Sequence, residues 1–262
     1  IVGALAVRLT RLEQQRVFAK PTENLEAYDL VLRARELIGR SERSANREAR
    51  ATLERALKLA PKYADAYVAL AEAELQRGGR GWIENPEEAI SRGEDLAKHA
   101  LTLDEPGANA RAHGLLARVY SVTAQFDLAL VEADRAIEQN VSDAMAYALR
   151  GEALLWLGRL DESIAASEAA RRFDPRIDPD SGFSLAMAYY ASGRYREALA
   201  AADTALARAP DYGYLHAVRA AALGQTGNTE EARKAADQLL RRDPFFRVER
   251  FAQIIVHAHG KA

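Results

Sequence analysis

The stretch Ala170-Arg171-Arg172-Phe173-Asp174-Pro175 decides the fold, because a related phrase, Ala205-Leu206-Ala207-Arg208-Ala209-Pro210, begins 35 residues later. The alanine that opens the phrase has counterparts on both sides, with a leucine in the last copy. The series is Ala56, Ala100, Ala136, Ala170, Ala205 and Leu239, with spacings of 44, 36, 34, 35 and 34 residues. A nearly fixed period of this length predicts a repeated supersecondary unit.

Three further series keep phase with the first, and each has a physical role in a helical hairpin. Two consist of small residues, which allow helices to approach closely: Ala117, Gly151, Ala186 and Ala220, and then Ala129, Ser163, Ala198 and Ala232. The third consists of Ala124, Gly158, Gly193 and Gly227. Glycine accepts the left-handed conformation that ends a helix, and proline stops the helix that follows. No run alternates as a strand, so the sequence predicts an all-α chain.

This pattern resembles the tetratricopeptide repeat (TPR), which has small residues at positions 8, 20 and 27, a turn near 15 and proline at 32. The resemblance implies a right-handed superhelical solenoid of helix-turn-helix repeats. Six can be phased within an array at 21–246: 27–63, 64–107, 110–143, 144–177, 179–212 and 213–246. Extra residues are expected in turns around 41–46, 78–86 and 105–107. The apolar spacing of residues 1–20 predicts an amphipathic helix, and residues 247–262 are expected to form a capping helix and tail.

Composition excludes several classes of function. Apolar residues make up 48% and charged residues 28%, as in a folded globular chain. The net charge of −2 argues against nucleic acid or an anionic membrane as partner. The absence of cysteine excludes disulfides and Cys-ligated metals, and no apolar run is long enough to cross a bilayer. The scattered histidines and paired carboxylates form no catalytic or metal-binding pattern, so we expect no enzyme activity, metal or cofactor.

Three stretches resemble a narrower group of proteins: 21–36, 82–86 and 243–251. They are similar to the C-terminal repeat region of bacterial class III adenylate/guanylate cyclases and TolB-like regulatory proteins. The resemblance implies a regulatory or scaffolding part of a larger signalling protein, with residues 1–10 ending a preceding TolB-like domain and no catalytic residue carried over. The chain opens with Ile1, and we therefore expect a longer parent, either cytoplasmic or, with an upstream transmembrane helix, periplasmic.

The concave face of such an array is where a partner is expected, and family geometry places positions 2, 5, 9, 12 and 13 of each first helix along it. The predicted groove is an apolar patch with charged flanks, made of Arg118, Glu152, Leu155, Trp156, Phe183, Met187 and Tyr190. The Lys and Asn with which chaperone-binding relatives hold a C-terminal carboxylate are absent, so we do not expect a heat-shock co-chaperone. An apolar and aromatic patch usually marks an interaction site, and we therefore expect an apolar peptide or amphipathic helix, in the parent or elsewhere. Two alternatives remain: Trp156 and Phe183 pack in the core, or the module drives self-association as a homodimer.

Overall fold

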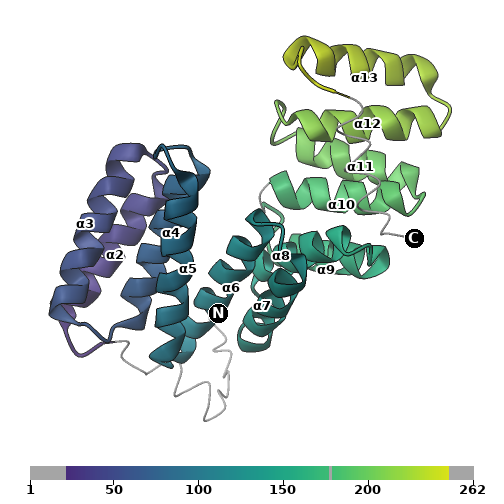
Figure 1. Ribbon diagram of the computed structural model, residues 1–262. Coiled ribbons are helices and arrows are strands. Elements are labelled where there is room, and N and C mark those ends of the chain that lie inside the picture. Colours follow the sequence, from purple (N-terminus) through teal and green to yellow (C-terminus); the bar gives the residue numbers. More distant parts are fainter. Residues whose placement is uncertain (1–21, 177–178, 248–262) are drawn as a thin grey trace, which may run out of the picture. The chain divides into compact units, whose positions relative to one another are not determined.

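The computed structural model describes residues 22–176 and 179–247, and this part of the chain folds into helices joined by short turns (Figure 1). The chain divides between Val119 and Tyr120 into two compact units, which we describe separately. Unit 1 contains α2 (Leu25–Gly39), α3 (Arg43–Leu59), α4 (Ala64–Gly79), α5 (Pro86–Thr102) and most of α6 (Pro106–Val122). The predicted helix at residues 1–20 lies outside the described residues, as does the predicted cap beyond residue 247.

Unit 2 continues with helices of very even length. They are α7 (Phe126–Gln139), α8 (Ala144–Trp156), α9 (Leu160–Phe173), α10 (Pro179–Ala191), α11 (Tyr195–Leu206), α12 (Gly213–Gln225) and α13 (Thr229–Arg242). The predicted repeat range 144–177, for example, holds α8 and α9. The fold is therefore all-α, as the period of the sequence predicted.

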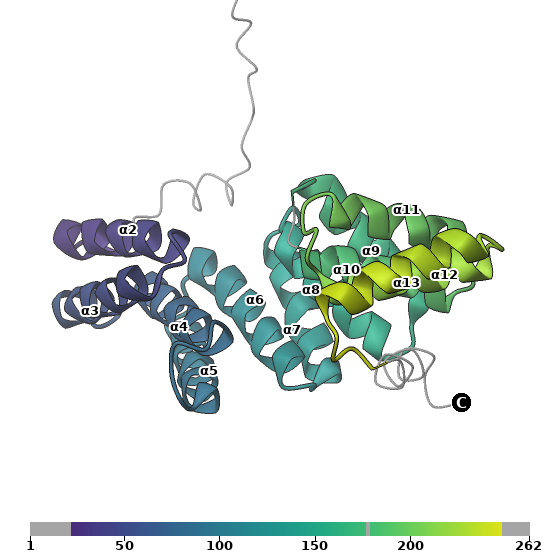
Figure 2. The ribbon, with the colours of Figure 1, turned by 90° about the horizontal axis from the view of Figure 1, so that it is seen from above.

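Within α2 to α5 and within α7 to α13, each helix packs on its neighbours in the sequence, and first helices of successive pairs also pack on one another. In unit 2, α10 contacts α9 and α11 and in addition α8 and α12. In unit 1, α2 contacts both α3 and α4, and α2 and α3 run side by side in both views (Figures 1 and 2). The even-numbered helices thus form one layer within each unit.

The turn inside each hairpin has the backbone that the glycine series predicted. Gly158, Gly193 and Gly227 have φ values of 74°, 73° and 83°, and Ala124, at the equivalent position of the preceding turn, has a φ of 57°. A backbone hydrogen bond closes each of these turns in the same way; for instance, the N–H of Arg159 donates to the carbonyl of Leu154 at 2.9 Å. This is the Schellman arrangement, in which a left-handed residue ends the helix.

The junction between α8 and α9 shows why small residues recur at positions 8 and 20. The hydroxyl of Ser163 donates to the carbonyl of Gly151 at 2.7 Å, in a fully buried contact. A Cβ atom added to Gly151 would collide with the hydroxyl of Ser167 and would lie 3.2 Å from the Ser167 backbone nitrogen. Glycine is therefore required here by the close approach of two helices.

One sequence-based expectation about unit 1 was wrong. The region 41–46 was predicted to be an enlarged turn, but α3 begins at Arg43 and runs for 17 residues. The extra residues lengthen the helix, because Ala45 and Ala49 fall on its buried face and Asn46 is held by the carbonyl of Ala73 at 2.9 Å. Residues Gly78 and Gly79 likewise belong to α4 and not to the turn that follows.

Candidate functional site

Three of the predicted groove residues belong to the core of unit 2. Leu155 and Met187 are fully buried, and Phe183 is 9% exposed. They pack in one cluster with residues of α10 to α12 such as Ala186 and Leu215. The reason is the contact of α10 with both α8 and α12, which covers the faces that these side chains occupy. The predicted apolar surface therefore does not include these three side chains.

Trp156 and Tyr190 pack against the same core but remain half-buried. Trp156 ends α8 and stacks on Phe126, the first residue of α7, with 5.7 Å between ring centroids. Tyr190, near the end of α10, meets Tyr195 at the start of α11 with a centroid distance of 5.3 Å. Each of the four rings is half-buried, and each lies beside a turn within a hairpin.

We name Phe126, Trp156, Tyr190 and Tyr195 the aromatic edge. Antiparallel hairpins bring the ends of first helices and the starts of second helices to the same border of a stack, so this border of unit 2 carries aromatic rings. Ion pairs lie at the starts of the second helices that follow these turns: Arg159 to Glu162 at 2.6 Å and Arg194 to Glu197 at 3.0 Å. Rings half-covered by protein and flanked by charges can hold an apolar group from one side.

The two charged residues predicted to flank the groove lie in different units. Glu152 is half-buried on α8, one turn before Trp156. Arg118 is exposed on α6 and belongs to unit 1. In unit 2, the candidate surface therefore consists of Glu152 and the aromatic edge, and sequence analysis identified Glu152, Trp156 and Tyr190 of it.

An ionic cluster in unit 1 was not anticipated. The carboxylate of Asp65 on α4 accepts a hydrogen bond from Arg35 of α2 at 2.8 Å and a second from Arg111 of α6. Burial, together with the neighbouring Arg35, lowers the pKa of Arg111 to about 10. Burial beside Glu105 raises the pKa of Tyr63 to about 12. Because Asp65 binds both arginines, the cluster joins three successive first helices of unit 1 and has a structural role.

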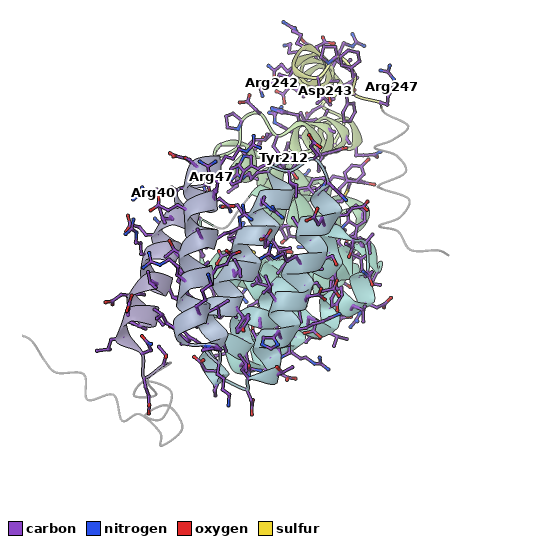
Figure 3. All side chains as sticks on the ribbon, turned by 60° about the vertical axis from the view of Figure 1, so that its left-hand side comes forward. Arg40, Arg47, Tyr212, Arg242, Asp243 and Arg247 are labelled. Atoms are coloured by element: carbon purple, nitrogen blue, oxygen red, sulfur yellow. The ribbon has the colours of Figure 1, made fainter. Side chains whose placement is uncertain are left out.

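A second aromatic group gathers around the last hairpin. The Phe183 ring lies 6.1 Å from that of Tyr212 and 6.0 Å from that of Tyr214, and Tyr214 lies 6.3 Å from Phe246. Phe245 is 83% exposed beside a cavity of about 240 Å³ that Tyr214 and Phe246 line. In Figure 3, Arg242, Asp243 and Arg247 carry labels at this end of the unit.

His99 and His216 make structural contacts. His216 is buried, with its Nε2 atom 2.7 Å from the carbonyl oxygen of Pro210, and the ring of His99 lies 4.5 Å from that of Tyr67. Among residues 22–176 and 179–247, no three His, Cys, Asp or Glu side chains gather as a metal site would require. Nor is any helix in these ranges long and apolar enough to cross a membrane.

Comparison with known proteins identifies the repeat. The family model described as tetratricopeptide repeat matches residues 41–80, 114–181 and 183–245. Among curated proteins, one from Rhizobium meliloti (strain 1021), named "Putative adenylate cyclase 3", is 32% identical over 127 residues. The match covers 48% of this chain and 21% of that protein, so the chain corresponds to about a fifth of its relative.

Solved structures show the same fold at low sequence identity. The structure of pilF from Pseudomonas aeruginosa is 16% identical with a TM-score of 0.67, covering 84% of this chain and 95% of that chain. The crystal structure of YrrB, described as a TPR protein with an unusual peptide-binding site, is 17% identical with a TM-score of 0.55. That match covers 79% of this chain and 96% of YrrB.

Proposed function

Because the chain belongs to the tetratricopeptide repeat family, we propose that it is a non-catalytic module that binds a protein or peptide partner. The repeat fold itself supports an interaction module. The aromatic edge of unit 2 is the observation that supports a particular binding surface. Its four half-buried rings contact one another in two pairs. Aromatic side chains with restricted rotamers give a large contact area at a low entropic cost, and they dominate the energy of many interfaces.

The partner that fits this surface is an apolar peptide or an amphipathic helix. The exposed parts of Trp156 and Tyr190 offer apolar area, while Glu152 and the arginines at the helix starts offer polar contacts around it. Buried apolar area supplies the main driving force of such association, and the surrounding polar groups fix orientation. A strongly acidic tail would leave the rings unpaired.

The proposal can be tested by selecting peptides from a displayed random library on the purified chain. We expect enriched peptides with apolar or aromatic anchors. The double variant Trp156→Ala, Tyr190→Ala should weaken their binding by about thirtyfold, the loss of one interface hot spot of about 2 kcal/mol.

The matched control is Tyr67→Ala, since Tyr67 is a half-buried ring of unit 1 outside the aromatic edge. Circular dichroism of all variants verifies that they are folded. Selected peptides without apolar anchors, or equal binding by the double variant and the wild type, would refute the proposed surface.

We also propose that the chain is a regulatory or scaffolding part of a larger, cytoplasmic bacterial signalling protein such as a nucleotide cyclase. Support comes from the 32% identity to "Putative adenylate cyclase 3" over 127 residues. Removing the segment that corresponds to residues 22–247 from the full-length parent should leave its catalytic activity measurable but change its regulation. Unchanged regulation by all parent effectors would contradict this role.

Self-association is a second candidate, favoured by the outer face of α2. Leu25 and Leu32 are 73% and 49% exposed, and Tyr28 between them is 36% exposed. The spacing i, i+3, i+7 places the three on one helical stripe. Light scattering after size exclusion should show a concentration-dependent dimer of the wild type. The double variant Leu25→Glu, Leu32→Glu should abolish this dimer. A wild-type monomer at all concentrations would rule out self-association.

A further inference from the structure

Unit 1 contains a polar cavity of about 510 Å³ where the start of α3 meets the end of α4 and the turn after it. Its lining consists of Arg43, Ser44, Asn46, Arg47, Arg50, Arg77, Trp82 and Ile83. Half of these residues are arginines and none is acidic. We call this cavity the arginine pocket. Its residues belong to unit 1, whereas those of the aromatic edge belong to unit 2.

The sequence of α3 aligns three of the arginines along one face. Arg43, Arg47 and Arg50 follow the spacing i, i+4, i+7, which repeats on one side of a helix and extends over roughly 10 Å. Arg77 faces them from the last turn of α4. Figure 3 labels Arg47 near the start of α3, close to Arg40 at the end of α2. Guanidinium groups from two helices therefore converge on one cavity.

A single buried carboxylate orients two of the arginines without satisfying them. Glu74 is fully buried, with its carboxylate oxygens 2.9 Å from Arg77 Nη2 and 3.4 Å from Arg50 Nη1. The same carboxylate lies 3.5 Å from Arg92 Nη1, and Arg92 also pairs with Glu54 at 3.3 Å, so three guanidinium groups share two carboxylates. The Nε atoms of Arg50 and Arg77 are buried and have no hydrogen-bond partner among the described residues. Positive charge thus exceeds negative charge behind the pocket.

The charges of the two exposed arginines, Arg43 and Arg47, are balanced by even fewer carboxylates. Arg43 and Arg47 form no ion pair with any residue in the described ranges. The carboxylates on the far side of Arg47 are Glu42 and Glu48, which line a neighbouring hollow, and Glu48 pairs with Arg33 at 2.7 Å. Glu42 is the N-cap of α3, and no acidic residue follows in the first turn of the helix.

One wall of the pocket is apolar. Trp82 and Ile83 lie in the turn after α4, and both are half-buried. An indole face beside guanidinium groups accepts a planar ring that is joined to anionic groups. An inorganic anion would use the arginines alone, and an acidic peptide would give the indole no planar partner.

We propose that the arginine pocket binds a nucleoside polyphosphate. The phosphate oxygens pair with the guanidinium groups of Arg47, Arg50 and Arg77, and the base lies against Trp82. Arginine matches phosphate through paired N–H donors, and the cavity volume falls within the roughly 300–1,000 Å³ of small-molecule sites. The proposal is independent of the peptide-binding function, because it rests on different residues in a different unit.

The chain contains two tryptophans, Trp82 and Trp156, which gives a direct optical test. In Trp156→Phe, all indole fluorescence comes from Trp82. We expect ATP without magnesium to change this fluorescence saturably and to give a matching isotherm by titration calorimetry. Adenosine, which lacks phosphate, and tripolyphosphate, which lacks the base, should each bind at least about tenfold more weakly, because each loses one class of contact.

The variant Arg47→Glu, made in the same background, should weaken ATP binding at least about tenfold, through loss of one charge-assisted contact and gain of a repulsive charge. Arg55→Glu is the matched control: it makes the same charge change on an exposed residue of the same helix outside the pocket. Circular dichroism melts confirm that both variants fold. No binding at millimolar ATP, equal losses in the two variants, or binding of poly-glutamate but not of ATP would each overturn the proposal.

Discussion

The single hydrogen atom that Gly151 carries as a side chain sets how closely α8 and α9 approach. We expect Gly151→Leu to lower the free energy of unfolding by about 1–3 kcal/mol, because the new side chain must enter a space already filled by Ser167. Urea denaturation measures the change. Gly114→Leu is the control, since nothing lies within 4 Å of a Cβ at that helical position; equal destabilisation of both variants would contradict the close-approach argument.

Tyr189 gives a pH-dependent prediction. Burial and its hydrogen bond to Glu168 raise the pKa of Tyr189 to about 12, above the ordinary value of 10.0. The unfolded chain therefore loses this proton first, so the stabilisation is complete below pH 10 and declines as the pH rises from 10 to 12. Tyr189→Phe should unfold with a shallower loss of stability between these pH values; parallel profiles for the variant and the wild type would refute this.

The sequence predicted the helix–helix contacts of small residues correctly, but it did not predict the exposure of large apolar side chains. Gly151 and Ser163 were assigned to a helix–helix contact from their series, and they form one. Leu155 and Met187 were assigned to a surface and are fully buried. Sequence position gives the face of a helix, but the depth to which the next helix covers that face depends on packing, which a single sequence does not specify. The arginines around Glu74 escaped notice for the same reason.

Among the helical hairpins, the turn at Ala124 departs from the glycine pattern. Its φ of 57° is costly for a residue with a Cβ atom. Ala124→Gly should therefore raise the free energy of unfolding by about 1 kcal/mol, and Gly158→Ala should lower it by a similar amount. Chemical denaturation of both variants checks the opposite signs.

The control for these turn variants is Ala165→Gly, on the exposed face of α9. Glycine inside a helix is destabilising by roughly 1 kcal/mol, so this change should lower stability. If Ala124→Gly also lowered stability, the strain assigned to the turn would be wrong.

The helices themselves followed from local signals, while their lengths depended partly on tertiary contacts. Glycine and proline marked the ends of α8 to α12 closely. In unit 1 the same signals failed at the start of α3, because Asn46 hydrogen-bonds to Ala73 and Gln76 on the next helix and thereby holds the extra turn. Such a contact between residues 27 and 30 positions apart leaves no local signature in the sequence.

At the scale of the whole molecule, stability comes from contacts between neighbouring helices within each unit. In unit 2 each described helix packs mainly on the next, and α13 contributes only two buried side chains, Ala235 and Leu239. Arrays of this kind behave as sums of local interfaces, so damage at one end need not reach distant helices.

Local stability of this kind leads to a test with Leu239→Ala. Leu239 is 4% exposed and packs into the core near Leu215, so its truncation should cost about 2–5 kcal/mol locally. Hydrogen exchange should become faster for amides of α12 and α13 while α8 and α9 keep their protection. Leu154→Ala, at a fully buried position of α8, should instead make amide exchange faster in α8 and α9. If Leu239→Ala accelerated exchange equally throughout unit 2, the unit would unfold as one cooperative body, and the nearest-neighbour description would be wrong.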